Sequence, residues 1–137
     1  MLLKSEWQEA CPVPSLVTDN PYLAYARASR LFDTQPVAQP GVHASAVVHE
    51  TVAVPASASI GAQVFIDAGV ELGEGVRIDP GCYLGAGVVL GANTRLYPGV
   101  VLYHGVKLGS DCSVHANTVI GSDGFGFARH SRGWSKI

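Results

Sequence analysis

Histidine is the side chain best suited to move a proton near neutral pH, and one histidine of this chain is placed to do so. His104 follows Tyr103 and precedes Gly105 in the run Leu-Tyr-His-Gly-Val-Lys-Leu-Gly. A histidine next to a glycine at a corner of the chain can project from the surface, where it could act as a general base. The alternative is a histidine that lies at the surface or in a contact between subunits.

A second group of candidates lies near the end of the sequence. Phe125 and Phe127 alternate with Gly124 and Gly126, which places two aromatic side chains on a flexible turn. Exposed aromatic side chains on a loop suggest a ligand or partner contact, although they could equally cover the side of a larger structure. Trp134 shares this ambiguity.

Basic side chains follow the aromatic pair at Arg129, His130, Arg132 and Lys136. They could meet an acidic partner, but a solvated charge cluster is the simpler interpretation.

Composition excludes several classes of protein. Cys11, Cys82 and Cys112 are odd in number and widely spaced, with no CxxC pair and no histidine spacing typical of zinc, so we expect reduced thiols, no metal and no other cofactor. Nine Lys and Arg against eleven Asp and Glu leave no basic stripe for nucleic acid. The start of the chain has no signal-peptide core, and no eighteen consecutive residues are apolar. We therefore expect neither export nor a transmembrane segment.

The elements that must position these side chains follow from a repeat. An aliphatic residue recurs at every sixth position from Val42 to Ile120. These residues are Val42, Val48, Val54, Ile60, Ile66, Leu72, Ile78, Leu84, Leu90, Leu96, Leu102, Leu108, Val114 and Ile120. Six residues advance an α-helix by about 600°, so a helix would scatter them around its axis. Short strands that turn a corner every six residues bring them into one interior, which predicts a triangular solenoid with about eighteen residues per coil.

Other positions of the repeat support the corners and the stacking of coils. The fourth residue after each aliphatic is small or β-branched at nearly every repeat, and the third is often Gly or Asn, which tolerate positive φ. Tyr97 and His115 stand eighteen residues apart, so they should stack, most simply as a polar ladder that contacts another subunit. His43 and His49 fall on different faces, and the histidine spacings do not match a zinc site with three histidines.

The residues before the repeat have a different pattern. Asn20 followed by Pro21 is typical of a helix start, with Asn as the cap and Pro at the first helical position. We expect a helix over about residues 20–33. Its apolar face comprises Ala24, Tyr25, Ala28, Leu31 and Phe32. Prolines at positions 36 and 40 then end the helix and form a linker.

The sequence thus predicts a mainly β protein in three parts. Residues 1–41 are expected to contain the helix and the linker, and residues 42–122 the β-helix. Residues 123–137 are expected to form a loop excursion, because Gly126 and Arg132 stand where aliphatic residues would recur.

Four segments in order resemble one enzyme family. They are Asn-Pro-Tyr-Leu-Ala-Tyr-Ala-Arg at 20–27, Pro-Gly-Val-His at 40–43, Tyr-His at 103–104 and Gly-Ser-Asp-Gly-Phe-Gly-Phe at 121–127. Together they resemble the UDP-3-O-acylglucosamine N-acyltransferases of lipid A biosynthesis over nearly the whole chain. The resemblance implies a left-handed parallel β-helix of hexapeptide repeats. It also implies that residues 1–41 are a short α/β remnant of an N-terminal, uridine-binding domain.

The resemblance further implies the chemistry. Members of that family are cytoplasmic homotrimers that move a 3-hydroxyacyl chain from acyl carrier protein to the 2-amino group of a UDP-sugar. Their catalytic histidine lies in a later coil, and the aromatic residues that hold uracil precede Met1, so we expect an inactive excerpt of the enzyme, truncated at both ends. His104 matches an earlier coil and is only a weak alternative base. A substrate or acyl-chain contact is expected at Asp123, Gly124, Phe125, Gly126 and Phe127.

Two other functions stay open. One is the related UDP-N-acetylglucosamine O-acyltransferase, whose repeats begin near the N-terminus, so a helix at Asn20 counts against it. The other is a trimeric β-helix scaffold without chemistry of its own. Trimer formation fits the enzyme and the scaffold alike and cannot separate them.

Overall fold

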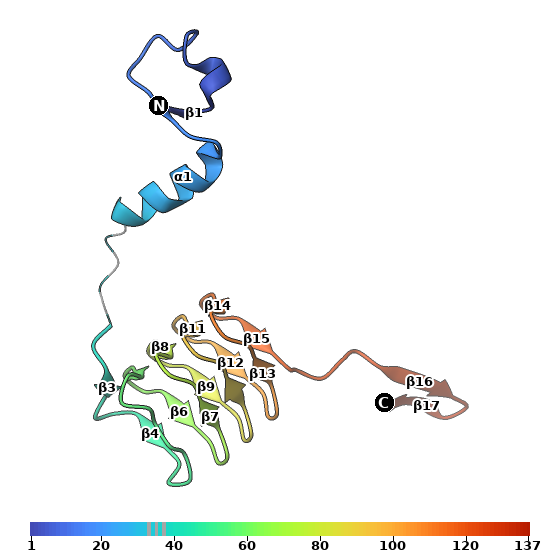
Figure 1. Cartoon of the computed structure of the whole chain (residues 1–137). Coiled ribbons are helices and arrows are strands. Elements are labelled where there is room, and N and C mark those ends of the chain that lie inside the picture. Colours follow the sequence, from blue (N-terminus) through green and yellow to red (C-terminus); the bar gives the residue numbers. More distant parts are fainter. Residues whose placement is uncertain (33, 35, 37) are drawn as a thin grey trace. The chain divides into compact units, whose positions relative to one another are not determined.

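A computed structural model describes residues 1–32, 34, 36 and 38–137 of the chain (Figure 1). The chain divides into two compact units, Met1–Val37 and Ala38–Ile137, which we describe separately. The helices within the described residues are too short or too polar to cross a lipid bilayer.

The first unit contains a small parallel sheet and one α-helix. Strand β1 (Leu2–Leu3) pairs with β2 (Leu16–Val17), with a 3-10 turn η1 (Ser5–Trp7) between them. Helix α1 (Pro21–Ser29) begins at the predicted cap, where the Asn20 side-chain oxygen accepts a hydrogen bond from the Leu23 N–H at 3.0 Å. The chain then tightens into the 3-10 turn η2 (Arg30–Phe32).

The sequence predicted a helix over about residues 20–33, but the α-helix ends earlier, at Ser29. The Ser29 hydroxyl donates to the Ala26 carbonyl at 3.0 Å, a local bond that competes with helical pairing at this end. Position 33 lies outside the described residues. No residue of α1 is buried, and Leu31 and Phe32 are more than 80% exposed. Within the described residues, the predicted apolar face is therefore largely exposed at Tyr25, Leu31 and Phe32, and only Ala24 and Ala28 are partly buried.

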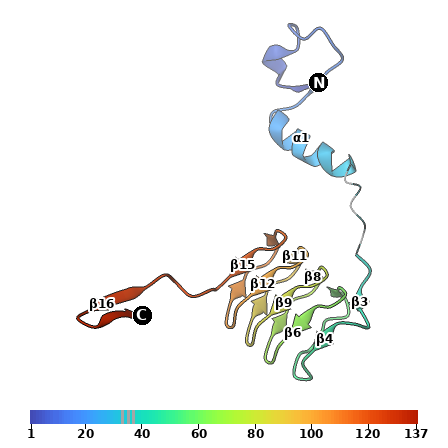
Figure 2. The same ribbon diagram turned by 180° about the vertical axis from the view of Figure 1, so that it is seen from behind.

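The second unit is a parallel β-helix, which confirms the predicted fold class. Its short strands stack into three sheets, each forming one face of the coil (Figures 1 and 2). The first face comprises β3 (Gly41–Val42), β5 (Ser59–Ile60), β8 (Arg77–Ile78), β11 (Arg95–Leu96) and β14 (Ser113–Val114). The second face comprises β4 (Val47–Val48), β6 (Phe65–Ile66), β9 (Tyr83–Leu84), β12 (Val101–Leu102) and β15 (Val119–Ile120). The third face comprises β7 (Glu71–Leu72), β10 (Val89–Leu90) and β13 (Lys107–Leu108). The left-handed sense of the coil stays a prediction from the family resemblance.

Aliphatic side chains of the six-residue repeat fill the interior. Strand partners are eighteen residues apart, so Ile60 lies opposite Ile78, and Leu84 opposite Leu102. Ile66, Leu84, Leu90, Leu96 and Leu102 are at most 1% exposed. The small or β-branched residues four places later are buried as well over residues 58–100, so they line the interior between the strands. Val42, at the end of the stack, is 48% exposed because no earlier coil covers it.

The corners follow a strict conformational rule. Every sixth residue from Gln63 to Asn117 has a φ between +57° and +73°, and most of these residues are glycine or asparagine, as the sequence predicted. Gln63 and Asp111 adopt the same conformation without being either type. Asp111 accepts a hydrogen bond from the Asn93 side-chain amide at 3.1 Å, so adjacent corners are also linked through their side chains.

The final residues form a hairpin, where the sequence predicted a loop over 123–137. Strand β16 (Phe127–His130) pairs antiparallel with β17 (Gly133–Lys136), and His130 lies opposite Gly133 across a two-residue turn. Gly133 has a φ of +135°, which other residues rarely adopt. The two strands lie where the aliphatic repeat is absent, and the short alternating pattern on either side of the turn is the only sequence signal for them.

Candidate functional site

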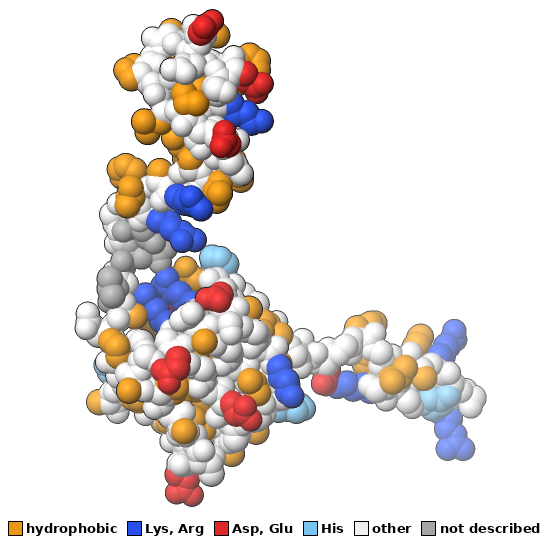
Figure 3. Space-filling model, in the orientation of Figure 1, with side chains coloured by type: hydrophobic (Ala, Val, Ile, Leu, Met, Phe, Trp, Pro, Cys, Tyr) orange, Lys and Arg blue, Asp and Glu red, His pale blue; other side chains and the backbone are white. Residues whose placement is uncertain are grey.

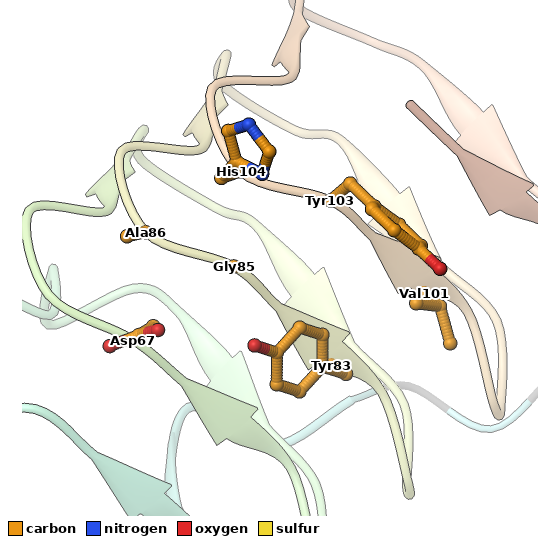
Figure 4. A pocket seen from close by; sticks show the side chains of 7 residues that line it. All are labelled: Asp67, Tyr83, Gly85, Ala86, Val101, Tyr103 and His104. Atoms are coloured by element: carbon orange, nitrogen blue, oxygen red, sulfur yellow. The ribbon is translucent and has the colours of Figure 1, made fainter. Parts of the chain in front are cut away.

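The second face of the β-helix carries a hollow of about 490 Å³ (Figure 4). Its lining comes from three successive coils and comprises Asp67, Tyr83, Gly85, Ala86, Val101, Tyr103 and His104. The ring of Tyr83 and the ring of Tyr103 lie on either side of the backbone at Gly85 in the close view. The weak candidate base His104 therefore lines the same hollow as two phenols and as the carboxylate of Asp67, which lies two coils away.

Gly85 explains why the hollow exists. Asp67, Gly85 and Tyr103 occupy the same place in consecutive coils, directly after β6, β9 and β12. A Cβ atom at Gly85 would lie 2.8 Å from the His104 backbone nitrogen, so a side chain at this position would force the backbone of the next coil to shift. The missing side chain leaves a gap between the carboxylate of Asp67 and the ring of Tyr103.

The polar groups around the hollow have few partners within the chain. One Asp67 oxygen, Oδ1, accepts a hydrogen bond from the Ala68 N–H at 2.7 Å. Within the described residues, Oδ2 of Asp67, the two tyrosine hydroxyls and the His104 ring have no hydrogen-bond partner. A histidine that acts as a base is usually oriented by a third group, and His104 has no such group here. The hollow offers donors, acceptors and aromatic surface to a ligand or partner.

The sequence-predicted residues 123–127 precede and enter the hairpin. Phe125 and Phe127 pack with ring centroids 5.2 Å apart, and together with Trp134 they line an apolar hollow of about 440 Å³. Asp123 forms an ion pair with Lys136. The Gly126 N–H donates to the Gly124 carbonyl at 3.0 Å, and the Gly126 carbonyl accepts from the Ile137 N–H at 2.9 Å. The two glycines thus shape the turn that brings the aromatic rings together.

The first face carries a charged cluster that the sequence interpretation missed. Asp79 is only 8% exposed, and its two carboxylate oxygens pair with Arg77 at 2.8 Å and Arg95 at 3.0 Å. The Arg95 guanidinium lies 3.9 Å from the ring centre of Tyr97 and donates to its hydroxyl at 3.2 Å. Arg77 and Arg95 stand eighteen residues apart, so the coil period could have revealed the cluster.

The structure also shows where the remaining candidate histidines and Tyr97 lie. Tyr97 stacks on His115 with ring centroids 4.8 Å apart, which confirms the predicted stacking, whereas its contact with another subunit stays a prediction. His43 follows the first face and His49 the second, as expected. The described residues contain no group of three or more His, Cys, Asp or Glu that could hold a metal ion.

Cys82 is a buried structural thiol. It donates to the Tyr97 carbonyl at 3.1 Å, and burial is the main cause that raises its pKa above the ordinary thiol value. The thiol is therefore protonated at neutral pH and is a poor nucleophile.

Comparison with known proteins agrees with this architecture. The family described as "Bacterial transferase hexapeptide (six repeats)" matches residues 57–92 and 87–122. A protein from Alcanivorax borkumensis named UDP-3-O-acylglucosamine N-acyltransferase is 53% identical over all 137 residues of this chain and 41% of its own length. Proteins with the same name from Saccharophagus degradans and Xanthomonas axonopodis pv. citri are 60% and 50% identical, again over the whole chain.

The match has a defined extent. The chain spans about two fifths of the length of these curated relatives, since 40% and 41% of the Saccharophagus and Xanthomonas proteins are covered. The matched region includes the first unit, the coils and the hairpin, since it comprises all 137 residues. Residues 57–122 match the bacterial hexapeptide-repeat transferase family, and the whole chain is similar to part of the UDP-3-O-acylglucosamine N-acyltransferases.

Proposed function

We propose that this chain contributes the first coils of an N-acyltransferase. The whole enzyme would move a 3-hydroxyacyl group from acyl carrier protein to the 2-amino group of UDP-3-O-acylglucosamine, a step of lipid A biosynthesis in the cytoplasm. The observation that carries the proposal is the identity of 53% to the Alcanivorax relative across all 137 residues, first unit and hairpin included. A resemblance limited to the repeat would indicate the fold alone.

The catalytic base belongs, in this proposal, to a coil outside residues 1–137. Acyl transfer requires a base that takes the proton from the attacking amine and a donor that stabilises the oxyanion formed from the thioester carbonyl. The solvent-exposed His104 lacks an orienting partner within the described residues, which supports a different base.

The role we propose for residues 123–127 is contact with the acyl chain. Phe125 is 97% exposed, and the hollow that it lines with Phe127 and Trp134 is almost entirely apolar, which suits a hydrocarbon chain. Asp123, paired with Lys136, and the two glycines of this segment would hold the turn. The active assembly would be a homotrimer, in which this hollow lies near a neighbouring subunit.

A chimera tests the proposal directly. Residues 1–137 replace the matching segment of the Alcanivorax borkumensis relative, and acyl transfer from 3-hydroxyacyl carrier protein to the UDP-sugar is measured. The chimera should be active, and the isolated 137 residues should show no turnover. An inactive but folded chimera would contradict the proposal.

The role of His104 is tested in the same chimera. His104→Ala should change kcat by less than about threefold, whereas loss of a general base costs about 10²–10⁴-fold. A loss in that larger range, or turnover by the isolated chain, would bring His104 forward as the base.

A further inference from the structure

We propose that the hairpin of one copy docks its aromatic and cationic side into the hollow on the second face of a neighbouring copy. The inference rests on the self-association included in the proposed function and does not depend on acyl transfer. It assigns a specific contact surface to each of two copies of the chain.

The hairpin needs a surface to pack against. A two-stranded hairpin is marginal in water unless it packs on another element. The strand register places Phe127 and Arg129 of β16 on the same side as Trp134 and Lys136 of β17. Trp134 is 66% exposed, and its ring lies 5.9 Å from the Arg129 guanidinium. Figure 3 shows hydrophobic and basic side chains next to each other on the hairpin.

The second face is the part of the described β-helix that is suited to receive this side. Large hydrophobic or aromatic side chains at least 40% exposed occur in every coil of this face: Val47, Phe65, Tyr83, Tyr103 and Val119. Phe65 and Tyr83 stack in parallel with centroids 5.4 Å apart and form a flat surface beside the hollow. The strands of the first face instead present Arg77 and Arg95 outward, and those of the third face present Glu71 and Lys107.

Charge and size match between the two surfaces. The hollow contains the Asp67 carboxylate, whose Oδ2 has no donor among the described residues. The Arg129 guanidinium contacts the Trp134 ring and has no acidic partner in the part of the chain described. A space of about 490 Å³ accommodates an indole ring together with part of a guanidinium. Docking would place this cation against the carboxylate and the indole between the tyrosine rings.

A second copy is the favoured occupant because both surfaces belong to the same chain. Each copy offers one hairpin and one hollow, and contacts of this heterologous kind close into a ring when the rotation permits. A ring of three copies would contain three identical contacts.

Fluorescence of Trp134 can test the contact. Trp7→Phe leaves Trp134 as the sole tryptophan. Its emission should shift to shorter wavelength as protein concentration rises and copies associate, with sedimentation measured on the same samples. Asp67→Lys should weaken association at least tenfold, Arg129→Glu likewise, and the double variant should recover most of the loss. Glu71→Lys, an equal charge change on the third face, should have little effect.

Mixing separates a contact between copies from a hairpin that folds back on its own coil. One partner carries Trp7→Phe and Asp67→Lys, so it has a reporting hairpin and a blocked hollow. The other carries Trp7→Phe, Trp134→Phe and Arg129→Glu, so it has no tryptophan fluorescence and keeps the unaltered hollow with Asp67. Mixing should shift the emission of the first partner.

Each contrary result overturns the inference. A shift that does not depend on concentration would indicate folding back, and association without a shift would indicate another interface. Absence of association up to the highest usable concentration would also reject it. The acyl-transfer assay of the chimera is independent of these outcomes, so a failure here would leave the enzymatic proposal standing.

Discussion

The first and second faces of the β-helix share one backbone and one interior but have opposite outer surfaces. On the first face, Asp79 pairs with two arginines, and Tyr97 stacks between Arg95 and His115. On the second face, Asp67, Tyr103 and His104 surround a hollow and find few partners within the described chain. The interior side chains determine the coil. The outer side chains can therefore either pair with one another within the chain or remain available to bind a ligand or a neighbouring subunit. A surface of the second kind is the better indicator of function.

The largest expected effect comes from breaking the interior that both faces share. Leu84 is fully buried, whereas Tyr83, its neighbour in β9, points outward and is 40% exposed. Leu84→Ala should lower the free energy of unfolding by about 2–5 kcal/mol, because it leaves a cavity in a close-packed core. Tyr83→Ala should cost about 1 kcal/mol or less. Urea unfolding measures both, and equal losses would contradict the assignment of inside and outside.

The two aspartates give the next largest difference. Asp79→Asn removes the carboxylate charge that two guanidiniums share, so two ion pairs are lost between groups that are only 25% and 21% exposed on the arginine side. We expect a loss of about 2 kcal/mol, less than for a fully buried pair because water screens the arginines. Asp67→Asn should change stability by less than about 0.5 kcal/mol. If urea unfolding showed that Asp67→Asn lowers stability more than Asp79→Asn, the view that Asp67 has few partners within the chain would be wrong.

What the sequence could predict follows the same division between inside and outside. The period of six located the interior aliphatic residues and most corners, and the eighteen-residue coil located the Tyr97–His115 stack. The hollow escaped prediction because it depends on a missing side chain at Gly85 as well as on the residues present. The packing of α1 could not be predicted either, since an apolar helical face indicates burial but does not say which surface provides it.

The hairpin and the assigned contact residues illustrate a second limit. The repeat ends at Ile120, and beyond it no regular pattern was available except the short alternation around Gly133. The role of residues 123–127 came from the family resemblance and stays a prediction. A periodic sequence predicts whether a side chain points inward or outward. It does not predict which group an exposed side chain binds.

Two glycines at the same place in the repeat sharpen the comparison further. A Cβ at Gly85 would meet the backbone of the next coil at 2.8 Å, whereas a Cβ at Gly109 meets nothing within 4 Å, and neither glycine has a positive φ. Gly85→Ala should therefore cost about 1–2 kcal/mol through forced separation of the coils. Gly109→Ala should be neutral or stabilising by up to about 1 kcal/mol, because it restricts the unfolded chain. Thermal unfolding of the pair measures the difference, and a similar loss at both positions would show that coil spacing is not what requires glycine at Gly85.

The smallest perturbation uses the thiols and leaves the fold intact. Burial raises the pKa of Cys82, so the fraction of its reactive thiolate is lower at any pH near neutrality and grows only at a pH above the ordinary thiol range. Cys11 and Cys112 are only partly buried. With a disulfide reagent at pH 7.5 these two should react first, and Cys82 should react only after urea is added or when the pH is raised well above 9. Mass spectrometry of the labelled peptides assigns each site. If Cys82 of the folded protein were labelled as fast as Cys112, the coil would have to open readily around the buried Cys82 side chain. The interior of the β-helix would then be accessible to solvent, and the contrast with its outer surface would no longer hold.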